Sequence, residues 1–225
     1  MKRRRGRLLL IALVGALSLS AVSAWATAQP VSPAPGAVVH STHPLFTWIL
    51  PTNEHSQAIY LANKPDTTPE GSFYTENVVD IGAFYPDDPR QWSPTSGLYA
   101  GRYWWLVESY DVDTYQSYRS TPIDFTIPVT ASVVGLRMRS YHYLRLLSIE
   151  ARWRSNVPEP VAQASLSTLA GRRVWSARRR EYNSLGSTES SSFDWYVPRR
   201  VRAGTRLRLV VRVSGASQRR VVRAP

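Results

Sequence analysis

The sequence predicts an all-β protein: two tandem antiparallel β-sandwiches that follow a helical N-terminal signal segment. Three observations support this fold class. Large apolar residues recur at every second position in both halves, as in Tyr103, Trp105 and Val107 and again through residues 207–213, which is the spacing of half-buried strands. About 200 residues remain after the signal, enough for two sandwiches of about 100 residues each. The two halves also differ sharply in charge.

Residues 1–28 have the pattern of a secretory signal peptide. Basic residues from Lys2 to Arg7 precede an apolar run over residues 8–24, and Ala26-Thr27-Ala28 suits cleavage. We therefore expect the protein to be secreted or associated with the cell envelope. The alternative is an uncleaved membrane anchor, because about 18 apolar residues approach the length that spans a bilayer. The chain has no cysteine, which excludes disulfides, thiol catalysis and cysteine metal sites.

The charge distribution separates an acidic module, residues 29–128, from a basic module, residues 129–225. The first has four lysines and arginines against eleven acidic residues, and the second has nineteen arginines against five acidic residues. The overall formal charge of +12 therefore conceals two oppositely charged units.

In the acidic module, the proline-rich residues 30–36 read as a lead-in segment or an edge strand. The next strand places Phe46 and Trp48 on one face, with prolines at both ends. The strands expected in this module are 44–51, 58–62, one within 73–84, 98–107 and 117–128.

The segment 98–107 carries the strongest strand pattern in the chain. Gly101 suits a sharp corner from which the Tyr103 hydroxyl can bond back to the backbone. Leu98, Tyr103, Trp105 and Val107 should face the interior, which puts Trp104, Leu106 and Glu108 on the opposite, solvent-facing side by strand parity.

An outward Trp104, with Tyr85, Trp92 and Tyr99 near it in sequence, predicts an aromatic platform for sugar rings or for a protein partner. The alternative is that these side chains pack under the long loop before residue 95 or against the second module.

Residues 30–128 resemble a fibronectin type III domain. The resemblance rests on the proline-rich start, Trp48 in the second strand, Tyr60 in the third, and Leu98 with Gly101-Arg102-Tyr103 before an alternating strand. It implies a sandwich that presents binding surfaces. The segment 64–95 is long and rich in aromatic residues for this family, and the absence of Arg-Gly-Asp means that no integrin binding carries over.

The basic module continues the alternation. Val134, Leu136 and Met138 should share one face, and so should Leu147, Ile149, Ala151 and Trp153. Further strands are expected at 161–169, 172–180, 192–198 and 206–213, with 219–223 as an edge. The run Gly204-Thr205-Arg206-Leu207 resembles the corner of bacterial immunoglobulin-like or fibronectin-like modules, over residues 197–213.

Arginines on these strands form a candidate binding surface for a polyanion. Arg206, Arg208 and Arg212 share a strand face, where neighbours two residues apart are about 7 Å from each other, and Arg172 and Arg173 begin another basic strand. Anionic wall polymers, phospholipid head groups or the acidic module are the expected partners, whereas export argues against nucleic acid. The alternative is an ordinary solvated face whose arginine stems cover apolar surface.

The sequence contains no Gly-x-Ser-x-Gly, P-loop, dinucleotide or His-Glu-x-x-His motif. His40, His43 and His55 are interpreted as loop residues, and Asp111 with Asp113 as a turn. We therefore expect an exported binding or structural protein with no catalytic residues, metal or cofactor, whose partner is a wall polymer, a carbohydrate or a protein. A carbohydrate-binding module and the accessory domains of a polysaccharide-acting system remain as alternatives.

Overall fold

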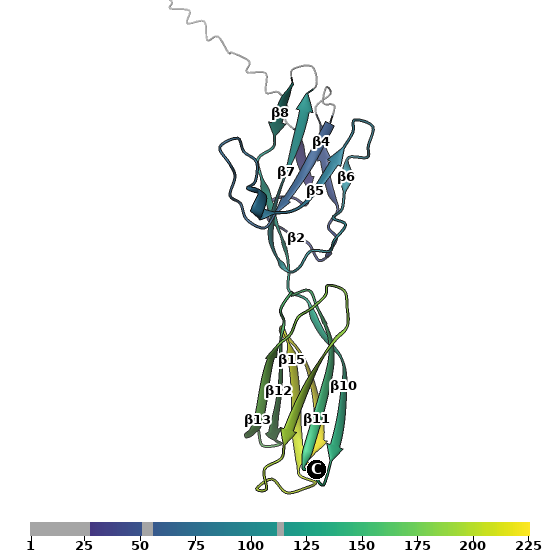
Figure 1. Ribbon diagram of the computed structural model, residues 1–225, viewed down its shortest axis with the longest axis vertical. Helices are drawn as coiled ribbons and strands as arrows, with labels where there is room; N and C mark the ends of the chain where they lie inside the picture. The colour runs from purple at the N-terminus through teal and green to yellow at the C-terminus, as the bar shows by residue number, and fades with distance from the viewer. Residues whose placement is uncertain (1–27, 51–55, 112–114) are drawn as a thin grey trace, which may run out of the picture.

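The computed structural model describes residues 28–50, 56–111 and 115–225, and this part of the chain is all-β (Figure 1). Its sheets form two groups that stack end to end along the long axis. The short 3-10 turn η1, Thr75–Asn77, is the helical element of the described residues. The predicted signal lies outside them except for Ala28, which is buried in the first core.

No helix within the described ranges has the length and apolar character needed to cross a membrane.

The first group contains two sheets (Figure 1). One has the order β1-β3-β6, and the other has the order β2-β9-β7-β4-β5 with β8 paired to β7. Neighbouring strands are antiparallel except β2 and β9, which are parallel. The bounds are β1 Gln29–Ser32, β2 Ala37–Val38, β3 Phe46–Ile49, β4 Ser56–Ala62, β5 Val78–Phe84, β6 Gln91–Trp92, β7 Gly101–Asp111, β8 Gln116–Arg119 and β9 Ile123–Ile127.

Aromatic side chains fill the first core. Trp105 and Phe125 pack edge-on against Phe46, with ring centroids 5.0 and 5.5 Å away. Tyr103 and Val107 are buried beside them. The prediction that Tyr103, Trp105 and Val107 face the interior is therefore confirmed. Edge-to-face packing at this spacing stabilises a pair of rings beyond the burial of their area.

The corner before β7 has the predicted hydrogen bond. The Tyr103 hydroxyl donates to the Tyr99 carbonyl at 3.0 Å. The bond ties the start of β7 to the segment that leads into it, as strand parity and Gly101 indicated.

The outward side of β7 is only partly exposed to solvent. Leu106 is completely buried with Ala62 and Phe73, and Trp104 is half-buried against this second cluster. The prediction that Leu106 faces solvent is therefore wrong. Parity does place Leu106 on the other face of β7 from Trp105. Phe73, from the long segment before β5, covers that part of the sheet.

The second group also contains two sheets, with the orders β10-β11-β14 and β13-β12-β15-β16, and all their neighbouring strands are antiparallel. The bounds are β10 Ala131–Tyr141, β11 Leu146–Ser155, β12 Val161–Thr168, β13 Arg173–Arg180, β14 Glu189–Tyr196, β15 Arg206–Val213 and β16 Ala216–Arg223. The predicted edge position of residues 219–223 is confirmed.

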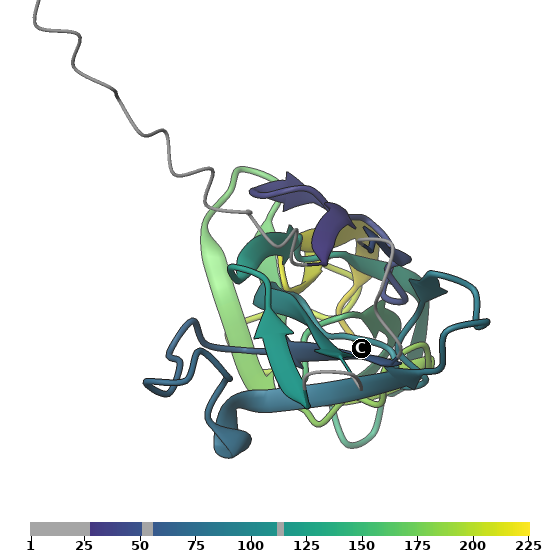
Figure 2. The same ribbon diagram turned by 90° about the horizontal axis from the view of Figure 1, so that it is seen from above.

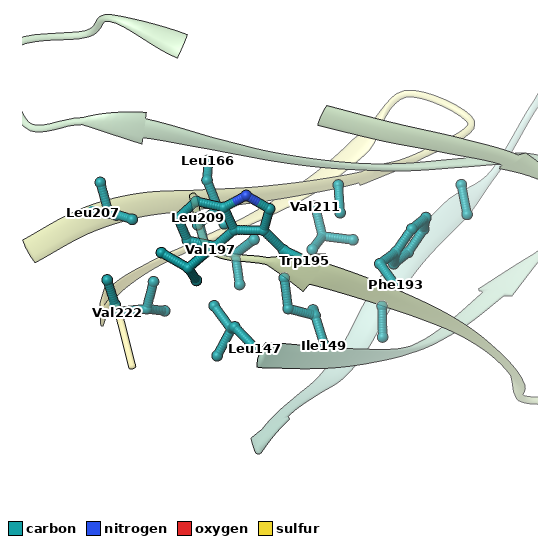
Figure 3. Packing of buried hydrophobic residues seen from close by; sticks show 14 of the residues in the cluster. Leu147, Ile149, Leu166, Phe193, Trp195, Val197, Leu207, Leu209, Val211 and Val222 are labelled. Carbon is teal, nitrogen blue, oxygen red and sulfur yellow. The ribbon is translucent and has the colours of Figure 1, made fainter. Parts of the chain in front are cut away.

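The second core lies between these two sheets. Figure 3 shows Leu147, Ile149 and Trp195 of one sheet packed with Leu209 and Val211 of the other. The Trp153 indole N–H donates to the Ser191 hydroxyl at 2.9 Å. A buried tryptophan therefore keeps its hydrogen bond, as burial of its polar atom requires.

One stripe of the second group is interrupted by a β-bulge. Val133 pairs with Trp153 and Gly135 pairs with Arg152, which leaves Val134 without a partner. The prediction that Val134 shares a face with Leu136 is wrong: Val134 is 51% exposed. The extra residue shifts the parity, so that Val133 and Leu136 both pack on the core.

The two groups meet at a polar junction. The Ala100 N–H donates to the Asn156 carbonyl at 2.8 Å, and the Tyr99 hydroxyl donates to the Asn183 carbonyl at 3.1 Å. Asn183 is itself buried. Figure 2, which looks down the long axis, shows the two groups superposed along that axis.

Candidate anion-binding surface

The sheet β13-β12-β15-β16 concentrates the basic charge of the second group. Its four strands, all described, contain ten arginines and no aspartate or glutamate. The facing sheet β10-β11-β14 contains four arginines and three acidic residues. The charge asymmetry therefore belongs to one sheet of the second group.

Strand parity turns seven of these arginines outward around β12. Leu207, Leu209 and Val211 are buried, so Arg206, Arg208 and Arg212 face solvent, as predicted. The registers then align other arginines with them. One row across the sheet reads Arg178, Gln163, Arg212, and a second reads Arg173, Ser167, Arg208. On the far strand, Arg223 pairs with Arg206 and Arg219 pairs with Val210.

We call this set the arginine surface: Arg173, Arg178, Arg206, Arg208, Arg212, Arg219 and Arg223, with Gln163, Ser165 and Ser167 between them. Arg206 and Arg212 lie six residues apart, or about 20 Å along the strand, and β13 and β15 lie two strand spacings apart, or about 10 Å. Rows of arginines thus flank a row of shorter polar side chains.

Counter-charges are scarce on the arginine surface. Among the described residues, an ion pair on this sheet joins Arg180 to Glu159 at 3.4 Å, and both side chains are well exposed. Arg206 and Arg223 stand directly opposite each other, an arrangement in which like charges destabilise a sheet. Guanidinium groups can donate two parallel hydrogen bonds to phosphate, sulfate or carboxylate oxygens. The chemistry of the surface is therefore recognition of anions.

Arg172 lies just outside the sheet. It follows Gly171 in the turn between β12 and β13, where its N–H donates to the Thr168 hydroxyl at 3.1 Å. It extends the arginine surface at its end near Arg173. Arg178, Arg219 and Arg223 were not singled out from the sequence, although their alternation along β13 and β16 could have indicated their outward direction.

The four predicted aromatic ligand residues occupy separate places. Trp92 is half-buried against Phe46, with ring centroids 5.3 Å apart. Tyr99 lies at the junction with the second group. Trp104 lies in the Leu106 cluster, with the Arg102 guanidinium 5.1 Å from its ring. Tyr85, by contrast, is 76% exposed. The structure therefore does not bring the four together, and ligand binding by them stays a prediction.

Glu108 and Arg119 form an ion pair at 2.8 Å, and their side chains are less exposed than those of the Arg102–Asp124 pair. Burial raises the pKa of the neighbouring Tyr60 above its ordinary value, and the Glu108 carboxylate raises it further. Both effects favour the neutral phenol. The described residues hold no cluster of three or more histidines and acids that would suit a metal ion; His55 and Asp113 lie outside them.

Comparison with known proteins assigns this chain to no family. No protein-family model matches the chain, and no curated protein matches it. Dimeric latent PorU from Porphyromonas gingivalis is similar over 88% of this chain and 20% of its own, at 13% identity and a TM-score of 0.30. An α-L-rhamnosidase from Streptomyces avermitilis, solved with L-rhamnose, is similar over 87% of this chain and 24% of its own, at 12% identity and a TM-score of 0.33.

This chain thus spans about a quarter or less of either solved protein. TM-scores at this level support no inference about function. The described residues are all-β with several antiparallel sheets, which is consistent with a β-sandwich architecture.

Proposed function

We propose that this chain is an exported, non-enzymatic binding protein of the cell envelope or extracellular space, and that its arginine surface binds an anionic polymer of the envelope. The observation that carries the proposal is the four-stranded sheet with ten arginines and no acidic residue. The facing sheet has nearly balanced charges. The arginines are therefore concentrated on one sheet and are not spread evenly over the second group.

We further propose that the two groups of strands are tandem β-sandwiches, the first like fibronectin type III and the second immunoglobulin-like. Each group has its own buried cluster between two sheets. The Tyr103 hydroxyl bond supports the likeness of the first. The end-to-end arrangement leaves the arginine surface of the second group uncovered by the acidic first group (Figure 1).

The arginine surface is better explained by a ligand than by stability. Seven like charges on one face repel each other, and an opposed pair such as Arg206 and Arg223 destabilises the sheet. A bound polyanion would offset this repulsion, because each arginine would then be attracted to a negative charge of the ligand. Each arginine near an anionic surface contributes about 1 kcal/mol at physiological salt, so several contacts together give a useful affinity.

The test compares two triple variants that remove the same charge. Arg206→Gln, Arg208→Gln and Arg212→Gln alter the arginine surface, whereas Arg137→Gln and Arg139→Gln with Arg152→Gln alter the facing sheet. Retention is measured by co-sedimentation with isolated cell envelopes and by titration with a purified poly(glycerol phosphate) chain, with neutral dextran as the polymer control.

Loss of three contacts should weaken binding by about a hundredfold at physiological salt, at roughly 1 kcal/mol each. The slope of log K against log salt should fall by about two, if each contact releases counterions as with single-stranded nucleic acid, at about 0.7 per contact. The facing-sheet variant should retain nearly full affinity. Equal losses of affinity in the two variants would show that binding depends on net charge alone, and would refute specific binding at the arginine surface.

A further inference from the structure

A second candidate binding site lies on the first group, away from the arginine surface. A hollow of about 290 Å³ opens where β4, β5 and β7 run side by side. Its lining includes Tyr85, Tyr110, Ala58, Ala83 and Glu108. We call it the Tyr85 hollow.

Short side chains create the hollow between larger ones. Ala58 on β4 pairs with Ala83 on β5 and with Glu108 on β7, so all three share one outward row. Tyr110 lies two residues beyond Glu108 and therefore faces the same side. The small side chains of Ala58 and Ala83 leave room beside Tyr110.

The position of Tyr85 is fixed by a tight turn directly after β5. Its N–H donates to the Asp88 carboxylate at 2.7 Å, and the Asp88 N–H donates back to the Tyr85 carbonyl at 3.1 Å. The backbone of Tyr85 is held while its ring stays largely in solvent. Such an exposed, positioned ring is available to a ligand without prior ordering of its backbone.

The polar groups of the Tyr85 hollow suit an uncharged ligand. Glu108 is neutralised by Arg119 at 2.8 Å, so the site has little net charge to offer an ion. Gln57 also lines the hollow, but it adjoins Ala58 in β4, so its side chain points to the core side of the sheet, where its Oε1 accepts from the buried Trp48 indole at 3.1 Å. The outward row therefore offers the Glu108 carboxylate as an acceptor near the two tyrosines.

We infer that the Tyr85 hollow is a subsite for one neutral sugar ring of a glycan chain. A pyranose presents apolar C–H faces that stack on tyrosine rings, and its hydroxyls both donate and accept hydrogen bonds. Glu108 would accept from one of these hydroxyls. The volume lies at the small end of the range for ligand pockets, which favours a single ring. This inference does not depend on the arginine surface.

The probes are cellotetraose, chitotetraose, xylotetraose and mannotetraose, with tetragalacturonate as the charged comparison. Binding to the full chain is followed by saturation-transfer NMR and calorimetry in about 1 M salt, where screening within about 3 Å silences the arginine surface. Tyr85→Ala tests the hollow, and Tyr143→Ala, which removes a similarly exposed ring from the second group, is the control.

At least one neutral tetrasaccharide should bind, and Tyr85→Ala should weaken it about tenfold through lost stacking and contact area, while Tyr143→Ala changes it less than twofold. Failure of all four neutral probes overturns the inference, as does binding of tetragalacturonate alone. Equal affinity in Tyr85→Ala and the parent chain would also overturn it. Because the salt silences the arginine surface, none of these outcomes bears on the polyanion proposal.

Discussion

The tyrosine corner gives the sharpest prediction about stability. Tyr103→Phe removes a single hydroxyl from a ring that is 8% exposed and that donates to the Tyr99 carbonyl at 3.0 Å. A net hydrogen bond contributes about 1 kcal/mol, and the carbonyl left without its partner adds to the loss. We expect Tyr103→Phe to lower the free energy of unfolding by about 1–2 kcal/mol at pH 7.

Urea unfolding followed by tryptophan fluorescence measures this loss. Tyr118→Phe is the control, because the Tyr118 hydroxyl donates to Gln116 in an exposed part of β8, where a hydrogen bond should contribute less than about 0.5 kcal/mol. The reasoning is refuted if Tyr103→Phe is no more destabilising than Tyr118→Phe.

The same substitution makes a pH prediction. Burial raises the pKa of Tyr103 above its ordinary value in the folded chain. A group with a raised folded pKa stabilises the fold fully below its unfolded pKa, about 10, and loses that contribution as the pH rises through the folded pKa. The parent chain should therefore lose stability above about pH 10, by at most about 1.4 kcal/mol per pH unit for this group. The gap to Tyr103→Phe should narrow there; a constant gap from pH 8 to pH 11 would contradict this origin.

Two further substitutions test the junction and the arginine surface. Asn183 is buried, and its amide donates to the Ser155 and Val157 carbonyls at 2.6 and 3.0 Å. Asn183→Ala should therefore lower the free energy of unfolding by about 2–3 kcal/mol. A loss of less than about 1 kcal/mol in thermal melts would show that these hydrogen bonds do not stabilise the junction. Arg206 lies directly opposite Arg223 on the neighbouring strand. Arg206→Gln should therefore raise the free energy of unfolding by about 0.2–1 kcal/mol at low salt and change it by almost nothing in about 1 M salt. A destabilisation at low salt would contradict repulsion between the two arginines.

The two proposed sites have different physical signatures. Binding at the arginine surface should weaken steeply as salt rises, because it depends on released counterions. Binding in the Tyr85 hollow should be nearly independent of salt, because the Glu108–Arg119 pair leaves the site close to neutral. Salt titration of envelope retention therefore separates the two contributions in one preparation.

The sequence by itself determined which side chains of a regular strand share a face. Alternation is a local property, since successive side chains of a strand point to opposite faces. It therefore placed Tyr103 and Trp105 in one core and Leu207 and Leu209 in another, and it turned Arg206 and Arg208 outward. The Tyr103 hydroxyl bond followed from the same local pattern with Gly101.

Only the tertiary structure decided which faces became surfaces. The cover of Phe73 over Leu106 and the bulge at Val134 depend on contacts between distant segments. Strand order, which has no local signature, set Arg173 and Arg178 across β12 from Arg208 and Arg212 and made separate basic strands into one surface. The Tyr85 hollow arises in the same way, because two alanines lie side by side only after β4 and β5 have paired.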